Sequence, residues 1–451
     1  MGLDVLMQKL STNPHQEILA SEEGVYTCKD LFESVSQFRE ILRQYEVKNG
    51  DCVRLNSDYS LQSIAVLIAL ILEKCILIPT LPNDLDQRKN DLIRAIADIE
   101  IRFENSDICV NRVVRNMEEE HVLISRLKEM ESSGLILFTS GTTGEPKGVV
   151  HNFESLLKKF VASKEELKAF RSVSILLFDH WGGLNTLFHS LFSLGFLALI
   201  QDRKPVTVAK AIEKHKLDLL PASPSFINLF LLSGVIGKHN LESLRWITYG
   251  AETMPESTLK RLHVLLPKVK LKQTYGLIEI GVLATKSQSD SSTLVKLGGA
   301  GYEIRIRDHQ LEIKAESSML GYLNADSPFT DDGFFKTGDY VEEHGEWVKI
   351  LGRKSNLIFT AGEKVHPSEV ETVILECEAV LDVRVFGKPH PLLGNVVAAE
   401  VKISHEGNKE LIRNQILELC RSQLSRIKIP MYIEFTNKEL FNNRLKKERR
   451  N

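Results

Sequence analysis

Residues 137–151 read Leu-Phe-Thr-Ser-Gly-Thr-Thr-Gly-Glu-Pro-Lys-Gly-Val-Val-His. Hydroxyl side chains and glycine amides can surround phosphate oxygens, and a lysine adds a compact positive charge. The apolar run over residues 134–138 precedes this loop and predicts a buried strand that would anchor it. The composition therefore predicts a loop that binds a polyphosphate through Thr139, Ser140, Gly141, Thr142, Thr143, Gly144 and Lys147.

Two other interpretations of the loop are weaker. A Walker A loop needs Gly before its lysine and Ser or Thr after it, whereas Pro146 precedes Lys147 and Gly148 follows it. An ordinary surface turn rarely combines so many hydroxyl groups with a lysine and a preceding apolar strand. A phosphate-binding loop is the interpretation that explains all of these features.

Bulk properties narrow the class of protein. The chain has 451 residues, of which 43% are hydrophobic, enough for a large core in several domain-sized units. A net charge of -3 provides no general attraction for nucleic acid or an anionic membrane. The six cysteines lack paired spacing, which argues against a disulfide framework and a zinc site and predicts free thiols in a cytoplasmic protein.

The first residues show no export signal or myristoylation site. The longest apolar run, residues 64–72, is too short to span a bilayer. We therefore expect neither secretion nor a membrane span.

Hydrophobic periodicity predicts an α/β fold. A helical pattern over residues 30–45 and a short apolar strand over residues 75–79 show the rhythm of βαβ units around a parallel sheet. Either Ser225 or Ser223 would cap a helix that reaches Leu232. The alternation also predicts helices over residues 153–170 and 184–194, and strands over residues 173–178 and 196–200.

The pattern changes in the last third of the chain. From Gly298 to Ile350, short alternating strands with glycine-rich turns predict a small β subdomain. Beyond residue 356 the chain returns to a mixture of helix and strand. The hydrophobic pattern there predicts helices over residues 368–377 and 409–425 and strands over residues 380–386 and 398–403.

The loop at residues 137–151 resembles the signature loop of the adenylate-forming superfamily, which includes acyl-CoA synthetases, luciferases and the adenylation domains of nonribosomal peptide synthetases. In that family the loop grips the phosphates of ATP. The resemblance implies a large N-terminal domain of layered α/β subdomains over residues 1–352 and a hinge over residues 353–356. It also implies a small, mobile α+β C-terminal domain over residues 357–451.

A second element, residues 273–281, resembles the family's Tyr-Gly-x-Thr-Glu motif. The resemblance implies that Tyr275 and Gly276 border adenine and that Glu279 helps to hold Mg²⁺. A flat aromatic face and a hard carboxylate suit these roles. Ile278 replaces the usual threonine, whose hydroxyl can reach the α-phosphate. Because one such hydrogen bond contributes about 0.5–1.5 kcal/mol, we expect altered rather than abolished catalysis.

Further motifs follow in the family's order. Thr337-Gly-Asp339 resembles the element whose carboxylate binds both ribose hydroxyls, and Arg353 resembles the second ribose contact. Ser355 stands at the position of the hinge residue. Residues 362–371 resemble the segment that opens the C-terminal domain.

Two segments resemble the lining of the acyl site. His180, within residues 176–183, matches the family's histidine that lines the acyl pocket and gates the incoming thiol, although Asp179 stands where an apolar residue is usual. Residues 249–252 resemble the strand end that borders the adenine and acyl sites, with Gly250, Ala251 and Glu252 at its edge. We expect Glu252 to be solvated rather than catalytic.

The basic segment over residues 444–450 stands where the family carries its catalytic lysine. Lys446 is the better match, and Lys447 is the alternative. The lysine of the family contacts the substrate carboxylate and the α-phosphate during adenylation.

Together these motifs imply an AMP-forming acyl-CoA synthetase that uses ATP, Mg²⁺ and CoA to activate a small carboxylic acid. No motif supplies a cation for a second carboxylate, which favours an apolar acyl or aryl acid. One alternative is a stand-alone ligase that loads the phosphopantetheine of an acyl or peptidyl carrier protein. A second is a non-catalytic, nucleotide-binding relative, and a P-loop NTPase is more remote. No nucleic-acid partner is expected.

Overall fold

The computed structural model describes residues 2–82, 84–104, 107–113, 119–140, 145–161, 167–360, 362–391, 393–403 and 408–440. The chain divides into two compact units that interleave along the sequence. The first unit comprises Met1–Pro221, Gly276–Val282 and Lys314–Phe335, and the second comprises Ala222–Tyr275, Leu283–Ile313 and Lys336–Asn451.

A seven-stranded sheet forms the centre of the first unit. Its order is β20 (Gly321–Tyr322), β8 (Pro146–Asn152), β7 (Gly134–Ser140), β4 (Ile76–Thr80), β3 (Cys52–Asn56), β5 (Ile99–Glu104) and β6 (Asp107–Arg112). The pairs β3/β4, β3/β5 and β4/β7 are parallel, as the βαβ pattern predicts. The pairs β20/β8, β7/β8 and β5/β6 are antiparallel, and the phosphate loop connects β7 to β8.

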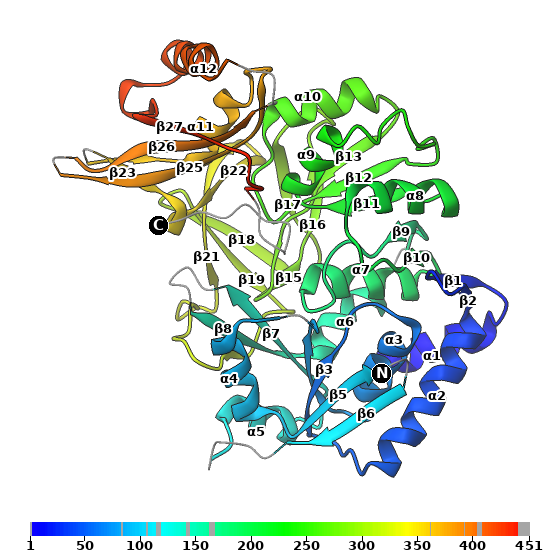
Figure 1. Cartoon of the computed structure of the whole chain (residues 1–451). Coiled ribbons are helices and arrows are strands. Elements are labelled where there is room, and N and C mark those ends of the chain that lie inside the picture. The colour runs from blue at the N-terminus through cyan, green and yellow to red at the C-terminus, as the bar shows by residue number, and fades with distance from the viewer. Residues whose placement is uncertain are drawn as a thin grey trace. The chain divides into compact units, whose positions relative to one another are not determined.

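Helices cover both faces of this sheet. On one face, α4 (Gln87–Ile96) and α5 (Val122–Glu129) pack Ile93, Ile96, Ile124 and Leu127 against alternate residues of the strands, including Ile76, Ile78, Ile136 and Phe138. The apolar helix α3 (Leu61–Leu72) is buried from Ser63 to Ile71 and contacts β4 and α2 (Cys28–Gln44). Figure 1 shows α4 and α5 on one side of β3 and β5, with α2 and α3 on the other.

A second sheet in the first unit has the order β2 (Val25–Thr27), β1 (Glu17–Ala20), β10 (Phe196–Ala198) and β9 (Arg171–Val173). Ring contacts join helix α6 (Phe153–Val161) to helix α7 (Trp181–Phe192). The rings are those of Phe153, Phe160, Phe188 and Phe192. The remaining elements are α1 (Gly2–Thr12), α8 (Pro205–His215), β11 (Leu219–Ala222), β14 (Gly276–Leu277) and β15 (Gly281–Val282).

Two predictions for this region are wrong in extent. The helix expected over residues 153–170 is described only to Val161, and residues 167–170 are not helical. The strand expected over residues 173–178 ends at Val173. Beyond Val173, a side chain rather than the main chain accepts the next hydrogen bond: Ser174 Oγ accepts the Ile200 amide at 2.9 Å. The apolar residues that follow are buried without forming a strand, because burial alone does not dictate backbone conformation.

The second unit contains the predicted β subdomain. Its six strands have the order β16 (Ala284–Ser287), β17 (Leu294–Gly298), β22 (Trp347–Arg353), β21 (Phe335–His344), β19 (Gln310–Ala315) and β18 (Tyr302–Arg307). The sheet therefore begins before Gly298, where the sequence pattern placed its start. The same unit holds the parallel pair β12 (Trp246–Tyr249) and β13 (Lys270–Gln273), with α9 (Pro224–Leu232) and α10 (Glu256–Leu265).

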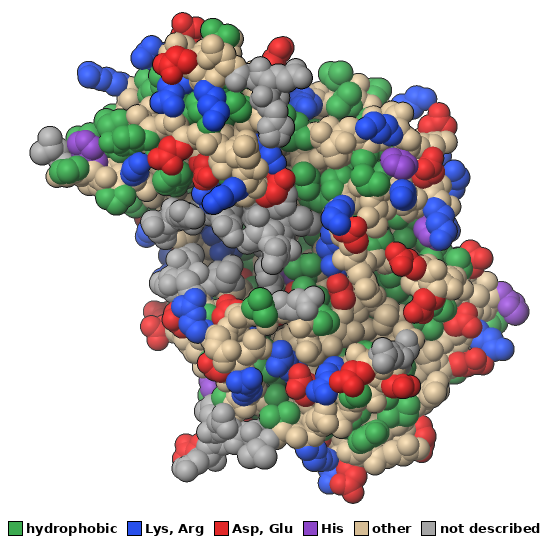
Figure 2. All heavy atoms as spheres, viewed as in Figure 1, with side chains coloured by type: hydrophobic (Ala, Val, Ile, Leu, Met, Phe, Trp, Pro, Cys, Tyr) green, Lys and Arg blue, Asp and Glu red, His purple; other side chains and the backbone are tan. Residues whose placement is uncertain are grey.

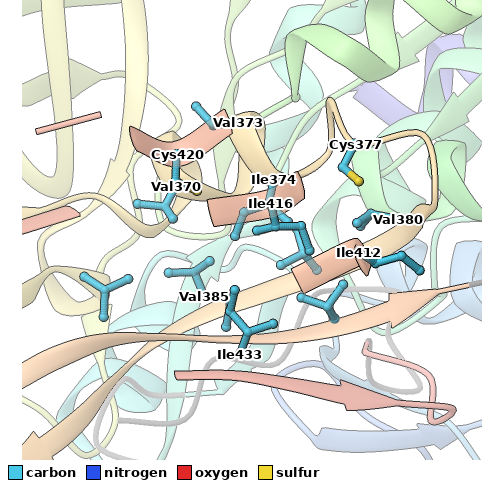
Figure 3. Close-up of a cluster of buried hydrophobic side chains, with 14 of the residues drawn as sticks. Val370, Val373, Ile374, Cys377, Val380, Val385, Ile412, Ile416, Cys420 and Ile433 are labelled. Carbon is cyan, nitrogen blue, oxygen red and sulfur yellow. The ribbon is translucent and has the colours of Figure 1, made fainter. Parts of the chain in front are cut away.

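The C-terminal segment forms a helix-on-sheet core. Its sheet is β24 (Glu363–Val365), β23 (Ile358–Thr360), β26 (Gly394–Ile403) and β25 (Val380–His390), with β27 (Tyr432–Thr436) paired to β26. Figure 3 shows residues of α11 (Pro367–Ile374) and α12 (Lys409–Gln423), such as Ile374 and Ile416, meeting Val385 and Ile433 of the strands. The predicted helix and strand positions are confirmed within a few residues. The short helices η1 (Lys354–Asn356) and η2 (Arg426–Lys428) complete the set.

The sequence predicts that the cysteines are free thiols and that the surface charges produce no general field for nucleic acid. All six cysteines are free. Figure 2 shows Lys and Arg side chains interspersed with Asp and Glu on the face in view. Among the described residues, no helix is both long and apolar enough to cross a membrane.

Candidate active site

The phosphate loop connects two paired strands of the first unit. Thr139 on β7 lies directly opposite Lys147 on β8, and Ser140 lies opposite Pro146. The backbone of both loop ends is therefore fixed by the sheet. Gly141, Thr142, Thr143 and Gly144 lie outside the described residues, as does the side chain of Ser140. The predicted buried strand before the loop is confirmed, because residues 135–138 are buried.

Glu279 lies in the same unit and is only 8% exposed. Its Oε1 accepts a hydrogen bond from the Tyr322 hydroxyl at 2.9 Å, and its main-chain carbonyl accepts the Met319 amide at 2.7 Å. The Lys147 Nζ lies 5.2 Å from the centre of the Tyr322 ring. The structure thus connects the predicted phosphate lysine and the predicted magnesium carboxylate through one tyrosine.

The residue beside Glu279 is held by a buried histidine. His151 Nε2 lies 2.6 Å from the carbonyl oxygen of Ile278. Burial lowers the pKa of His151 to about 4, so the imidazole is neutral near pH 7. Because a carbonyl can only accept, Nε2 carries the proton and donates it. Ile278 itself is buried, so its side chain fills apolar space where the family usually has a threonine.

Glu279 fits a magnesium ion that is shared with phosphates. Among the residues that the structure describes, no group of three or more His, Cys, Asp or Glu side chains could hold a metal alone. Mg²⁺ does not need such a group, since it is commonly bound by one or two carboxylates, substrate phosphates and waters. A single oriented carboxylate is therefore a suitable protein ligand.

The predicted ribose site lies within the second unit. Asp339 on β21 lies opposite Arg353 on β22, and the Arg353 Nε is 3.6 Å from Asp339 Oδ1. The Tyr275 hydroxyl donates a hydrogen bond to Asp339 Oδ2 at 2.5 Å. Three residues that resemble nucleotide contacts are thus brought together from positions 275, 339 and 353.

Burial controls the protonation of this cluster. Desolvation raises the pKa of Asp339, and the charge of Arg353 and the Tyr275 hydrogen bond partly offset that effect. Desolvation also holds the pKa of Tyr275 well above its ordinary value, and the neighbouring carboxylate adds to the rise. Tyr275 therefore remains a hydrogen-bond donor. This role of its hydroxyl is additional to the ring-stacking role that the sequence implies.

The segment after β12 shows three features that the sequence does not predict. A Cβ at Gly250 would lie 2.5 Å from Thr274 Oγ1, so close packing within the protein already requires glycine there. Ala251 adopts a left-handed conformation with φ of 69°, which is unusual for alanine. Glu252 is not merely solvated, because it accepts hydrogen bonds from the Ser225 hydroxyl at 2.7 Å and the Ser225 amide at 3.2 Å.

The choice between two helix caps is also decided. Ser223 caps α9 by accepting the Phe226 amide at 3.1 Å. Ser225 lies inside the helix and serves Glu252 instead.

His180 caps helix α7 in the first unit. Its Nδ1 accepts the Gly182 amide at 3.0 Å, and its side chain is half-buried. The preceding Asp179 is buried and lies 3.1 Å from Lys89 Nζ, which also lies 2.6 Å from Asp84. His180 is therefore held by its capping bond at the start of α7 and by the buried ion pair of the preceding Asp179.

Of the predicted hinge residue and catalytic lysine, the structure describes only the hinge residue. Ser355 lies in the short helix η1, directly after β22. Lys446 and Lys447 lie outside the described residues. The structure therefore describes Thr139, Lys147 and Glu279 in the first unit, together with Gly276. It describes Tyr275, Asp339 and Arg353 in the second.

Sequence reasoning missed Tyr322 and His151. His151 ends the quoted loop segment, yet nothing local indicates that it binds a carbonyl 127 residues away. Tyr322 follows Gly321 at the sheet edge, and its partner is 43 residues away. Only the pairing of β20 with β8 could have indicated its importance.

Comparisons with known proteins agree with the fold and the motifs. The 2-succinylbenzoate–CoA ligase of Bacillus subtilis (strain 168) is 26% identical over 466 residues, which cover 94% of this chain and 92% of that protein. The structure of the anthranilate CoA ligase AuaEII with anthranoyl-AMP has a TM-score of 0.83 at 18% identity, covering 99% of this chain and 95% of that one.

A second solved structure is similar over the same extent. It is the o-succinylbenzoate CoA synthetase MenE from Bacillus subtilis in complex with the acyl-adenylate intermediate OSB-AMP, with a TM-score of 0.76 at 22% identity. The likeness covers 98% of this chain and 95% of the MenE chain. At these identities, the two structures establish the likeness of the fold.

Family models match most of the chain. The C-terminal domain of AMP-binding enzymes matches residues 369–447. The AMP-binding enzyme model matches residues 6–329, which include the phosphate loop and the segment with Tyr275 and Glu279. Since that match alone exceeds half of the chain, the protein belongs to the AMP-binding enzymes of the adenylate-forming superfamily.

Proposed function

We propose that this chain, an AMP-forming acid–thiol ligase, activates an apolar or aryl carboxylic acid with ATP and transfers the acyl group to CoA. The observation that carries the site assignment is the buried Asp339 with Tyr275 and Arg353 around it. A buried carboxylate is costly unless it is hydrogen-bonded or paired, and here Tyr275 and Arg353 compensate that cost. Its free acceptor capacity suits the two hydroxyls of a ribose.

In the first step, a carboxylate oxygen of the acid attacks the α-phosphorus of ATP, and pyrophosphate leaves with the electrons of the broken P–O bond. The protein must position the reactants and neutralise growing negative charge, and it needs no nucleophile of its own. Lys147 and the loop from Thr139 would bind the β- and γ-phosphates. Asp339, Arg353 and Tyr275 would hold the nucleoside.

Glu279 would hold Mg²⁺ on the phosphates, where the ion supplies neutralisation of charge. We assign Lys446 to the developing charge at the α-phosphorus and to the substrate carboxylate. Gly250, Ala251, Glu252 and Gly276 would border adenine and the acyl group. These assignments follow the motif resemblance.

In the second step, the sulfur of a thiolate attacks the acyl carbonyl carbon, and AMP leaves with the electrons of the C–O bond. We place this step near His180. A rotation of the C-terminal domain about Ser355 would withdraw Lys446 between the two steps. The domain bounds proposed for this motion are residues 1–352 and 357–451, with the hinge at 353–356.

The acid class is supported by two observations. The motif residues that resemble the acyl-site lining contain no lysine or arginine for a second charged group. Similar proteins act, by their names, on 2-succinylbenzoate and anthranilate, which supports an aryl acid. Because 2-succinylbenzoate carries a second carboxylate, the acid panel includes dicarboxylates. The free thiols of all six cysteines suit a reducing compartment such as the cytoplasm.

The test is ATP–pyrophosphate exchange over a panel of aryl and acyl acids, followed by acceptor assays with the best acid. We expect exchange with an aryl or apolar acid and thioester formation with CoA. Transfer to a phosphopantetheinylated carrier protein in preference to CoA would reassign the acceptor. Binding of ATP without exchange for any acid would instead identify a non-catalytic nucleotide-binding protein.

A further inference from the structure

A short segment of the chain lies along the strand that carries Lys147. The Leu323 amide donates to the carbonyl of Gly148 at 2.8 Å, in register with the antiparallel β20/β8 pair. This approach is close, since a Cβ at Gly148 would lie 2.6 Å from Leu323 Cδ1. Glycine at this position therefore lets the segment lie against β8.

Where the main-chain pairing ends, the side chain of Asn324 continues it. Asn324 Oδ1 accepts the Gly148 amide at 3.0 Å, and Asn324 Nδ2 donates to the Pro146 carbonyl at 2.8 Å. Pro146 and Gly148 are the two neighbours of Lys147. One amide side chain thus fixes the main chain on both sides of the predicted phosphate lysine.

Tyr322 contacts both charged groups of the predicted triphosphate site. Its ring lies 5.2 Å from Lys147 Nζ, and its hydroxyl donates to Glu279 Oε1 at 2.9 Å. A cation is attracted to an aromatic face, and a carboxylate is oriented by a hydroxyl donor. In the described residues Lys147 and Glu279 form no ion pair with each other, and Tyr322 contacts each of them instead.

A direct ion pair between these residues would occupy both groups that the phosphates and the metal need. A long lysine side chain also loses much conformational freedom when it is immobilised. A tyrosine that holds the ammonium and the carboxylate in separate contacts reduces both costs, because the site is arranged before its ligand binds.

We propose that Tyr322 and Asn324 are positioning residues of the ATP site. Asn324 fixes the backbone of Lys147, and Tyr322 orients the Lys147 ammonium and the Glu279 carboxylate for the magnesium-bound triphosphate. This inference rests on the proposed function, because it takes Lys147 and Glu279 as the groups that contact the phosphates and Mg²⁺.

The first test uses Tyr322→Phe, which keeps the ring beside Lys147 and removes the hydroxyl donor to Glu279. Binding of a non-hydrolysable ATP analogue is measured by calorimetry with and without Mg²⁺. We expect the gain in affinity that Mg²⁺ brings to fall by about tenfold, as for loss of a hydrogen bond to a charged group. Binding without Mg²⁺ should change little.

Tyr26→Phe is the matched control, because Tyr26 donates a similar bond to Glu23 at 3.1 Å on the surface of the same unit. Tyr322→Leu should also weaken binding of the analogue without Mg²⁺, since it removes the ring beside Lys147. An unchanged effect of Mg²⁺ in Tyr322→Phe would overturn the role of Tyr322.

The second test uses Asn324→Ala, with Asn13→Ala as its control because Asn13 donates to the Lys9 carbonyl at 2.9 Å elsewhere in the unit. We expect analogue binding to weaken about tenfold with and without Mg²⁺. Thioester formation from preformed acyl-adenylate should be retained, because that step no longer involves the β- and γ-phosphates. A lower melting temperature with unchanged analogue affinity would show a purely structural role.

The two proposals fail in different ways. If the wild-type protein binds no ATP analogue, the proposed function is wrong. If the wild type binds MgATP normally and both variants bind equally well, only the positioning inference is wrong.

Discussion

At the scale of single residues, His151 shows how burial decides the protonation state of a side chain. It is 1% exposed, its pKa is lowered to about 4 by desolvation, and its Nε2 bonds to the carbonyl of Ile278 at 2.6 Å. A neutral imidazole therefore connects the phosphate-loop strand to the residue next to Glu279. The sequence shows the histidine, but its partner is a main-chain atom with no sequence signature.

We predict that His151→Gln removes a pH dependence of stability. The pKa of His151 in the folded protein lies below its ordinary value of 6.5. Between pH 6.5 and about 4, the unfolded chain therefore binds more protons at this residue than the folded protein does. In the wild type, His151 therefore lowers the free energy of unfolding by up to about 3 kcal/mol as pH falls through that window. Glutamine can donate a similar bond and does not titrate.

Urea unfolding at pH 7, 5.5 and 4.5 tests this prediction. The free energy of unfolding of the glutamine variant should approach or exceed that of the wild type as pH falls. Parallel pH profiles for the two proteins would contradict the assignment of a neutral, buried His151.

At the scale of elements, a buried ion cluster joins the start of α4 to the segment before α7. Lys89 is 4% exposed and lies 2.6 Å from Asp84 and 3.1 Å from Asp179. Asp179 was an unexplained departure from the family motif, and the pairing with Lys89 accounts for it. Since His180 follows Asp179 directly, the cluster also helps to place the start of α7.

We predict that Lys89→Met destabilises the protein by about 3 kcal/mol, because it leaves two carboxylates without their shared cation. The adjacent Arg88→Met is the matched control. Arg88 and its partner Glu145 are both more than half exposed, so that change should cost less than about 0.5 kcal/mol. Equal unfolding midpoints for the two variants in urea would show that the cluster contributes no more than a surface pair.

Elements also show the limits of periodicity. The helix over 184–194 and the strand over 75–79 are confirmed by α7 and β4 within three residues. The strand over 173–178 is wrong because Ile175, Leu177 and Phe178 are buried by tertiary packing while their backbone is not part of a strand. An apolar run reports burial, and its conformation depends on which partners are available.

At the scale of the whole molecule, the reaction is proposed to need two positions of the C-terminal domain. The family model of that domain extends to residue 447 and therefore includes both candidate lysines. The division at residues 353–356 and the choice of Lys446 remain predictions.

We predict that Lys446→Ala reduces ATP–pyrophosphate exchange about 100-fold, as for the loss of one group that stabilises transition-state charge. Thioester formation from preformed acyl-adenylate should be affected far less, because the proposed rotation withdraws the lysine before that step. Lys447→Ala is the control and should keep most of both activities. Equal losses in the two half-reactions would refute alternation about Ser355.

The family and its reaction class could be recognised from contiguous motifs, because a phosphate loop, a Tyr-Gly element and a Thr-Gly-Asp turn each place their chemistry within a few neighbouring residues. Tertiary structure was needed for the contacts of Asn324, Tyr322, His151 and Lys89, whose partners are 178, 43, 127 and 90 residues away. Such contacts have no local pattern, since sheet pairing and burial bring the partners together. They determine how firmly the recognised residues are held.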